Sequence, residues 1–152
     1  MIKISFVWRD NVIDGMTDDD QRAMSSVLAG ISSSGHGEHI LCASVSALME
    51  HTARNVIRYI CDRKISEMIA GEINVEPGPD NCLPDTHIGK MEISAPAKER
   101  TPISFILSWD AATHPAVMVL MNSLYGMLGL LAKQTGAIEV EDMHIAQRIG
   151  RG

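Results

Sequence analysis

Residues 35–69 read GHGEHILCASVSALMEHTARNVIRYICDRKISEMI, and this stretch decides the predicted fold. After a polar, glycine-containing loop, apolar residues recur every three or four positions. They are Val45, Leu48, Met49, Ala53, Val56, Ile57, Ile60, Ile65, Met68 and Ile69. Glu50 and Arg54 lie on another face, spaced to form an ion pair one helical turn apart. The spacing predicts one long amphipathic helix, with room for a break near Asp62 and an end at Gly71.

The segment before this helix contains at least one predicted strand. Residues 2–8 alternate between apolar and polar and are rich in β-formers, which predicts a strand. Turn residues follow at Asp10-Asn11 and at Asp14-Gly15. Residues 17–30 fit a short helix that begins at an acidic cluster, but a strand over residues 27–33 fits as well. Both alternatives stay open from the sequence.

The segment after the helix predicts two more strands, a second helix and a last strand. Prolines and a glycine mark residues 76–86 as a loop, and strands are predicted over residues 87–94 and 102–108. Thr113 is the predicted cap of the second helix, with Pro115 in its first turn and Gly136 at its end. Residues 137–143 alternate as a final strand, before a short basic tail. This order predicts an α/β (α+β) fold with two long helices on a mostly antiparallel sheet, in a single domain over residues 1–152.

Composition excludes several classes of function. The 152 residues carry a net charge of −6, so no basic excess is present to bind nucleic acid backbones. Aromatic residues make up only 4%, which argues against platforms that stack bases. Three cysteines without a CxxC pair do not indicate a disulfide scaffold or a four-cysteine zinc site. With no signal peptide recognised, we expect a cytoplasmic protein without nucleic acid partners or cofactors.

A charge-free stretch raises the question of a membrane span. Residues 111–132 contain no Asp, Glu, Lys or Arg and are long enough to cross a bilayer. The stretch nevertheless includes His114, Asn122 and Tyr125. A helix covered on two sides, by the sheet and by a second copy of the chain, explains this composition better. We therefore expect a homodimer and no membrane partner.

The loop and the first turn of the long helix hold the parts of a cysteine protease. Cys42 is expected at the first residue of the helix, where unpaired N–H groups and a partial positive charge favour a thiolate. The amides of Ala43 and Ser44 would donate hydrogen bonds to an oxyanion. An imidazole from His36 or His39 would take the thiol proton and return it to a leaving amine. From the residues alone, the choice between the two histidines stays open.

Neighbouring residues support this hypothesis. Ser46 lies one turn beyond Cys42 on the same helix face, so its hydroxyl can reach the thiol region. Gly35 and Gly37 allow the loop that carries His36 to fold back towards the helix.

Other interpretations of the same residues are simpler or belong to a different class. Cys42 could be a buried, inert cysteine, which is the commonest fate of this residue. His36, His39 and Cys42 could also act together as metal ligands, although no fourth ligand is evident and we expect no bound metal. His51 lies on the far side of the helix and too far along it to serve as the base.

Two parts of the sequence resemble a known family. The run SGHG followed by HILCASVSAL is similar to the signature of the Prp family, the bacterial ribosomal-processing cysteine proteases. The stretch LMNSLYGMLGLLAKQTGAIEVED resembles the C-terminal half of that family. Similarity covers residues 35–57 and, less sharply, 117–141. Gly37 stands where the family has alanine, His39 stands where it has aspartate, and the loop between His36 and Cys42 is shorter.

The resemblance implies a function and roles for individual residues. It makes Cys42 the nucleophile and His36 the general base, with Gly35 shaping the loop and Ser46 and His39 in support. Known members are homodimers that remove a short extension from a ribosomal protein after an aromatic residue, and phage-associated relatives process virion proteins. We therefore expect a cytoplasmic, homodimeric thiol protease that hydrolyses a protein or peptide substrate. The alternative is a catalytically inactive, Prp-like homodimer that binds a protein partner.

Overall fold

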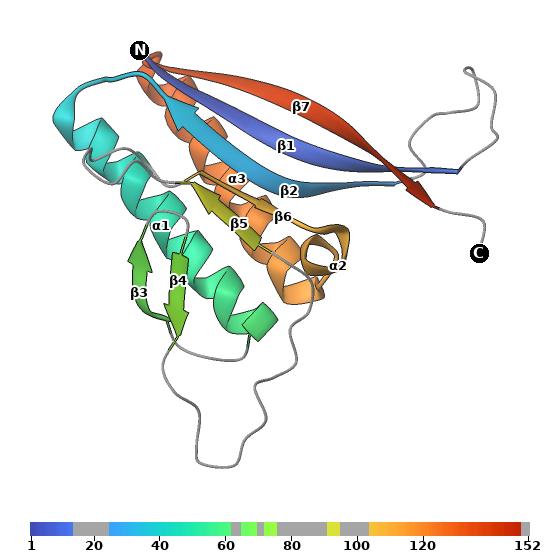
Figure 1. Cartoon of the computed structure of the whole chain (residues 1–152). Helices are drawn as coiled ribbons and strands as arrows, with labels where there is room; N and C mark the ends of the chain where they lie inside the picture. Colours follow the sequence, from blue (N-terminus) through green and yellow to red (C-terminus); the bar gives the residue numbers. More distant parts are fainter. Residues whose placement is uncertain (14–24, 62–64, 70–71, 76–90, 95–103, 150–152) are drawn as a thin grey trace.

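The computed structural model describes residues 1–13, 25–61, 65–69, 72–75, 91–94 and 104–149 (Figure 1). In chain order its elements are β1 (Ile2–Ile13), β2 (Ser25–Ser34), α1 (His39–Cys61), β3 (Ile65–Ile69), β4 (Glu72–Val75), β5 (Met91–Ser94), β6 (Ser104–Leu107), α2 (Trp109–Ala112), α3 (Pro115–Thr135) and β7 (Ile138–Ile149).

Five of the strands form one sheet in the order β5-β6-β2-β1-β7. The pairs β5–β6, β6–β2 and β2–β1 are antiparallel, and only β1–β7 is parallel. Strands β3 and β4 pair separately as an antiparallel hairpin beside α1 (Figure 1). The predicted α+β fold, with two long helices on a mostly antiparallel sheet, is confirmed.

The core lies between this sheet and the two long helices. Helices α1 and α3 contact each other, and α3 also contacts β7 and β2 (Figure 1). The sheet contributes alternate residues of β1 together with a run of β2, and each helix contributes one stripe. The fully buried members include Ile4, Phe6, Leu28, Ile31, Val45, Met49, Ala53, Val56, Val117, Met121, Leu124 and Leu128. Each large apolar side chain buried here contributes about 1.5–3 kcal/mol relative to leaving it exposed.

A bulge lies within the stretch of β2 that buries a continuous run of residues. The register of β1 against β2 shifts between Val7, which pairs with Gly30, and Trp8, which pairs with Leu28. The extra residue, Ala29, changes which side chains face the helices along the rest of the strand. Residues 27–31 are all buried.

The first strand is longer than predicted, and the turn expected at Asp10-Asn11 is wrong. Strand β1 continues to Ile13 because both of its edges are paired through this region, Asp10 with Ser26 of β2 and with Ala146 of β7. For the next segment the strand alternative is correct, since β2 covers Ser25–Ser34. Residues 14–24, which include the start of the alternative helix, lie outside the described residues.

The long helix ends next to the possible break predicted near Asp62, and its predicted continuation to Gly71 is wrong. Helix α1 ends at Cys61, and Ile65–Ile69 form β3 instead of a further helical turn. The apolar spacing of Ile65, Met68 and Ile69 fits either structure, and pairing with β4, which was not predicted, selects the strand. The expected pair of Glu50 and Arg54 is present, with 3.0 Å between Arg54 Nη2 and Glu50 Oε1.

The cap assigned to the second long helix is also wrong. Thr113 is the C-cap of the short helix α2, and the N-cap of α3 is His114, whose Nδ1 accepts a hydrogen bond from Ala116 N at 3.2 Å. The predicted end at Gly136 is confirmed by its left-handed conformation, with φ at 63°.

Three further expectations concern the remaining strands and loop. The strand predicted over residues 87–94 is present at Met91–Ser94, and the one over 102–108 at Ser104–Leu107. The last strand runs on to Ile149, through residues assigned to a basic tail. The loop predicted at 76–86 lies outside the described residues.

Helix α3 is apolar on its core side and also on much of the side that faces away from the core. Among the described helices, only α3 is long and apolar enough to cross a membrane. In its most apolar stretch of 18 residues, 22% is buried inside the protein. Its buried stripe belongs to the core, and its opposite side exposes Val119, Met127 and Leu130. The sheet therefore covers one side of the helix, and the other side is open in the single chain.

A polar cluster joins three strands near the far end of β1. Asp10 accepts a hydrogen bond from Ser26 Oγ at 2.6 Å, and both of its carboxylate oxygens lie 3.0 Å from His144 Nδ1. Partial burial would raise the pKa of Asp10, but the hydrogen bonds from Ser26 and His144 and the charge of His144 together lower it below 3.8. The ionised carboxylate thus ties β2 and β7 to β1.

Replacing this carboxylate should weaken the fold in a pH-dependent way. Asp10→Asn should lower the free energy of unfolding at neutral pH by about 1–3 kcal/mol, because it removes charge-assisted hydrogen bonds. The folded-state pKa is lowered, so the contribution is present above the unfolded value of 3.8 and is lost as pH falls through the folded value. Urea denaturation should show a larger difference between wild type and variant at pH 5 than at pH 3.

The matched control is the exposed Asp110 in the first turn of α2. Asp110→Asn should change the free energy of unfolding by no more than about 0.5 kcal/mol at either pH. Equal losses for Asp10→Asn at the two pH values would contradict the role assigned to the ionised carboxylate.

Candidate active site

The first turn of α1 begins earlier than the sequence predicted. The helix starts at His39, so Cys42 is its fourth residue and not its first. Cys42 N already donates to Glu38 O at 2.9 Å, which closes the first helical turn. The Cys42 side chain is half-buried and carries a free thiol.

Glu38 caps the helix, and the sequence reasoning missed it. Its carboxylate accepts hydrogen bonds from Ile40 N at 3.1 Å and from Leu41 N at 3.3 Å. Ser, Thr, Asp and Asn are the usual residues at this position, so a glutamate gave no clear signal. The position of Glu38, two residues before the apolar periodicity begins at Ile40 and Leu41, could have indicated it.

The amides proposed for an oxyanion hole are not free in this structure. Because α1 starts at His39, the N–H groups of Ala43 and Ser44 donate to carbonyls four residues earlier within the helix. Ser44 Oγ also donates to the Ile40 carbonyl, at 2.8 Å. The backbone amides of Ala43 and Ser44 therefore already donate hydrogen bonds within the helix. Any free amide that could bind an oxyanion must come from the loop before the helix.

The loop residue Gly37 supplies the polar contacts of the thiol. Gly37 N donates to Cys42 Sγ at 3.3 Å, and the Sγ–H group donates to Gly37 O at 3.6 Å. Side chains of a helix lean towards its N-terminus, which brings Sγ back over the preceding loop. The expectation that the glycine-rich loop folds back towards Cys42 is therefore confirmed, with main-chain atoms making the contact.

The first residues of β1 hold this loop in place. The amino group of Met1 donates to His36 O at 2.8 Å. Gly35 has φ at 80°, and a Cβ at this position would collide with the Met1 carbonyl oxygen, so only glycine fits. A Cβ on Gly37 would lie 3.1 Å from the side chain of Ile2, which therefore packs directly against the loop.

The two candidate histidines lie on either side of the capping residue. His36 and His39 are both exposed, and among the described residues neither imidazole forms a hydrogen bond with Cys42 Sγ. The described part of the chain also contains no group of three His, Cys, Asp or Glu residues that could hold a metal ion. His36, His39 and Cys42 are thus near one another along the chain without forming a ligand set. Ser46 is half-buried one turn beyond Cys42.

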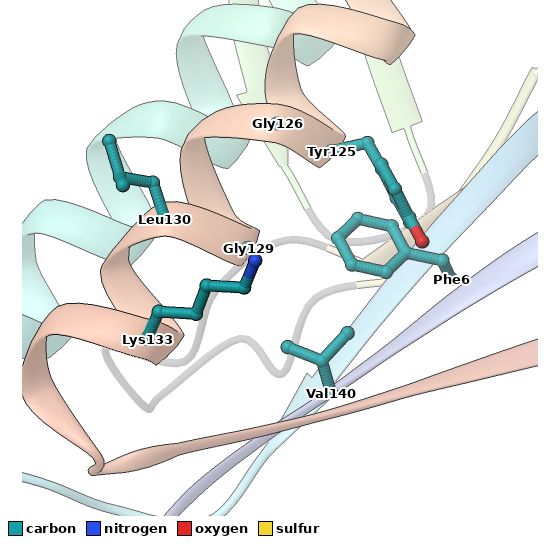
Figure 2. Close-up of a pocket in the computed structure, with 7 residues that line it drawn as sticks. All are labelled: Phe6, Tyr125, Gly126, Gly129, Leu130, Lys133 and Val140. Atoms are coloured by element: carbon teal, nitrogen blue, oxygen red, sulfur yellow. The ribbon is translucent and has the colours of Figure 1, made fainter.

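A separate cavity lies away from this loop. It measures about 390 Å³ and lies between α3 and the strands β1 and β7, next to Tyr125, Gly129 and Val140 (Figure 2). Neither Cys42 nor either candidate histidine is part of its lining. The cavity therefore does not define the candidate active site.

Comparison with solved structures shows which known folds this chain resembles. No protein-family model and no curated protein sequence matches the chain. The Staphylococcus aureus ribosomal processing protease Prp, solved with a covalently linked product peptide, superposes with a TM-score of 0.51 at 13% identity, over 93% of this chain and 99% of that one. SMU.848 from Streptococcus mutans superposes with a TM-score of 0.50 at 15% identity, over 95% of this chain and 99% of that one. The predicted resemblance is thus confirmed at the level of the fold.

The two loop glycines should respond differently to the same substitution. Gly35→Ala should cost at least about 2 kcal/mol of stability, because it combines a positive φ with a backbone collision. Gly37→Ala should cost no more than about 1 kcal/mol, because its nearest neighbour is the flexible end of Ile2 and the added Cβ stays 4.0 Å from Cys42 Sγ. Chemical denaturation of both variants measures the difference, and equal losses would show that the loop is not held as described.

Proposed function

We propose that the chain is a cysteine endopeptidase that uses Cys42 as its nucleophile and His36 as its general base. The observation that carries this proposal is the loop wrapped around the thiol, with Gly37 N 3.3 Å from Cys42 Sγ, in a chain with the fold of a ribosomal processing protease. The residues around Cys42 and His36 also resemble the signature of that family, with departures at Gly37 and His39 and a shorter loop. The likeness to solved structures supports only the fold. The geometry of the loop around Cys42 supports the assignment of the site.

The loop arrangement supports specific roles for its atoms. In this proposal the Gly37 amide, which donates to Cys42 Sγ at 3.3 Å, would donate to the thiolate that forms during the reaction. His36 is held through its carbonyl oxygen, so its imidazole can rotate towards Sγ without losing the anchor to Met1. Proton transfer requires that the imidazole approach Sγ to about 3 Å, directly or through one water.

The reaction then follows two steps. His36 takes the proton of the Cys42 thiol, and the resulting thiolate attacks the scissile carbonyl carbon, which forms a carbon–sulfur bond and moves the C=O π electrons onto the oxygen. The carbon–nitrogen bond breaks, the amine leaves with that proton, and a thioester remains on Cys42. Water attacks the thioester with His36 as base, which releases the carboxylic acid and restores the thiol. The substrate class we propose is a short segment of a ribosomal or virion protein, cleaved in the cytoplasm, where reducing conditions keep Cys42 free.

A peptide-binding protein without catalysis is the second candidate. The observation that favours it is the thiol contact itself, since Cys42 Sγ bonds to the Gly37 main chain and to neither imidazole. The Glu38 carboxylate also occupies two amides at the helix N-terminus that could otherwise stabilise negative charge. In this candidate the same loop would bind an extended peptide and leave it intact.

We also propose that the chain acts as a homodimer. Helix α3 exposes Val119, Met127 and Leu130 on the side opposite the core. An apolar helix face of this kind is typical of a surface that is covered by a partner.

Variants of the loop separate catalysis from binding. Cys42→Ala should abolish cleavage of a quenched fluorescent peptide library that carries an aromatic residue before the scissile bond. His36→Ala should lower the rate about 10²- to 10⁴-fold. His39→Ala should be milder, because His39 stands where relatives carry a carboxylate. The exposed helix residue His51 is the control, and His51→Ala should leave the rate unchanged.

Alkylation tests the nucleophile without any substrate. Iodoacetamide should modify Cys42 before Cys61 or Cys82, as mass spectrometry of the digested protein would show. Preferential reaction at Cys42 without peptide cleavage would support the binding candidate. Faster reaction at Cys61 or Cys82 would contradict both candidates, since neither could then rely on an accessible Cys42.

A further inference from the structure

The N-terminus of α3 is capped by a histidine, which is an unusual residue for this role. Ser, Thr, Asp and Asn are the usual caps, and their side-chain oxygens remain acceptors at neutral and mildly acidic pH. Here Nδ1 of His114 accepts the hydrogen bond from Ala116 N, at 3.2 Å. Histidine is the side chain that gains a proton between about pH 8 and pH 5, so this cap can be lost within that range.

The first turn of α3 offers no substitute for the imidazole. Pro115 is the first residue of the helix and has no N–H group. The His114 carbonyl is already used, because it accepts a hydrogen bond from Met118 N at 2.9 Å. Within the described part of the chain, Ala116 N donates to no acceptor other than Nδ1 of His114. Loss of this one contact would therefore leave the Ala116 amide without a protein partner.

The residue that carries the cap is held where three helices meet. The N–H group of His114 donates to Ala111 O of α2 at 3.3 Å, which fixes its backbone. Its half-buried ring lies beside the ring of Tyr59 in the last turns of α1, with 6.0 Å between the ring centroids. Figure 1 shows the end of α1 and the short helix α2 next to the start of α3. The imidazole is thus held close to Ala116 N by its surroundings.

Protonation would turn the capping acceptor into a donor. Both nitrogens of an imidazolium carry a hydrogen atom, so Nδ1 of His114 would then face the Ala116 N–H group as a second donor. The N-terminus of a helix also carries a partial positive charge, which disfavours a cation at this position. Both effects favour opening of the first turn of α3 once the imidazole is charged.

The charged and titratable groups around His114 do not replace the lost hydrogen bond. On the neighbouring helices they are Tyr59 and Arg58 of α1 and Asp110 of α2. On α3 itself the first charged residue is Lys133, in the last turn. Among the described residues, no ion pair joins any of these groups to His114. The Tyr59 ring lies at the outer limit of the distance at which an aromatic ring attracts a cation, so the direct bond to Ala116 is the stronger contact.

We propose that His114 is a pH-sensitive switch at the start of α3: the neutral imidazole closes the first helical turn, and its protonation opens that turn. The inference goes beyond the proposed function and does not depend on Cys42. Val117 and Met121 are fully buried in the core, so the opening is confined to the residues before them. The switch responds to acidification at the place where α1, α2 and α3 meet.

Replacing the imidazole by a cap that does not titrate tests the switch. His114→Asn retains a capping side chain, and its stability should not follow the charge of a histidine. The ratio of the unfolding equilibrium constants, wild type over variant, should therefore rise about fivefold between pH 7.5 and pH 5, the factor expected for loss of one typical N-cap. Groups that titrate elsewhere, such as Asp10 and His144, are present in both proteins and cancel in this ratio. Urea denaturation followed by circular dichroism measures both constants.

His51→Asn is the matched control, because His51 is an exposed histidine within α1. The corresponding ratio for this variant should stay constant between the two pH values. A constant ratio for His114→Asn, or an equal rise for His51→Asn, would overturn the proposal.

NMR spectroscopy of the folded wild-type protein locates the change. As pH falls, the amide signal of Ala116 should shift with the same midpoint as the carbon-bound ring signals of His114. In His114→Asn the Ala116 signal should not show this transition. An Ala116 signal that does not follow the His114 ring in wild type would overturn the switch, whatever the stability measurements give. Neither readout requires peptidase activity, so the outcome is independent of the proposed function.

Discussion

Everything near Cys42 depends on the pairing of β1 along both of its edges. Strand β2 binds one edge and β7 the other, so the first residues of β1 are fixed although they lie at the start of the chain. Met1 can then hold the carbonyl of His36, and Ile2 can pack against Gly37. Buried Ile2, Ile4 and Phe6 stabilise this pairing from the core side. The position of the loop is therefore set by strand pairing, and the loop in turn sets the surroundings of the thiol.

The electrostatics of the site follow from which groups occupy the N-terminus of α1. A helix offers only a few free amides there, and the Glu38 carboxylate takes those of Ile40 and Leu41. Cys42 comes after these positions, and its own amide closes the first turn. Its thiol consequently relies on the Gly37 amide in place of the helix terminus. This arrangement makes loop conformation, more than the helix dipole, the property that would control the reactivity of Cys42.

Sequence patterns predicted the parts of the fold that depend on local periodicity. The strand at the start of the chain, the amphipathic stripe of α1 and the end of α3 at Gly136 all follow from residue spacing or glycine chemistry. Errors arose where tertiary pairing decided between two local options, as for β3, whose apolar spacing also fits a helix. The same holds for the site: spacing identified Cys42 and the flexible loop, whereas the cap by Glu38 and the anchor from Met1 to His36 depend on contacts that the sequence does not display. Met1 and His36 are 35 positions apart, so no local sequence pattern predicts their hydrogen bond.

The candidate active site and β7 are connected through the first residues of β1. Ile138 pairs with Ile2, which packs against the Cys42 loop, so the start of β7 is close to the site. Met143 pairs with Val7, five residues further along β1, or about 16 Å at the rise of an extended strand. Between the two positions, Asp142 accepts a hydrogen bond from Trp8 Nε1 at 2.9 Å, and beyond them Asp10 joins His144, so β7 is held to β1 by side chains as well as by its backbone. The strand that positions the Cys42 loop is thus fixed along one edge by backbone pairing and by side-chain contacts with β7.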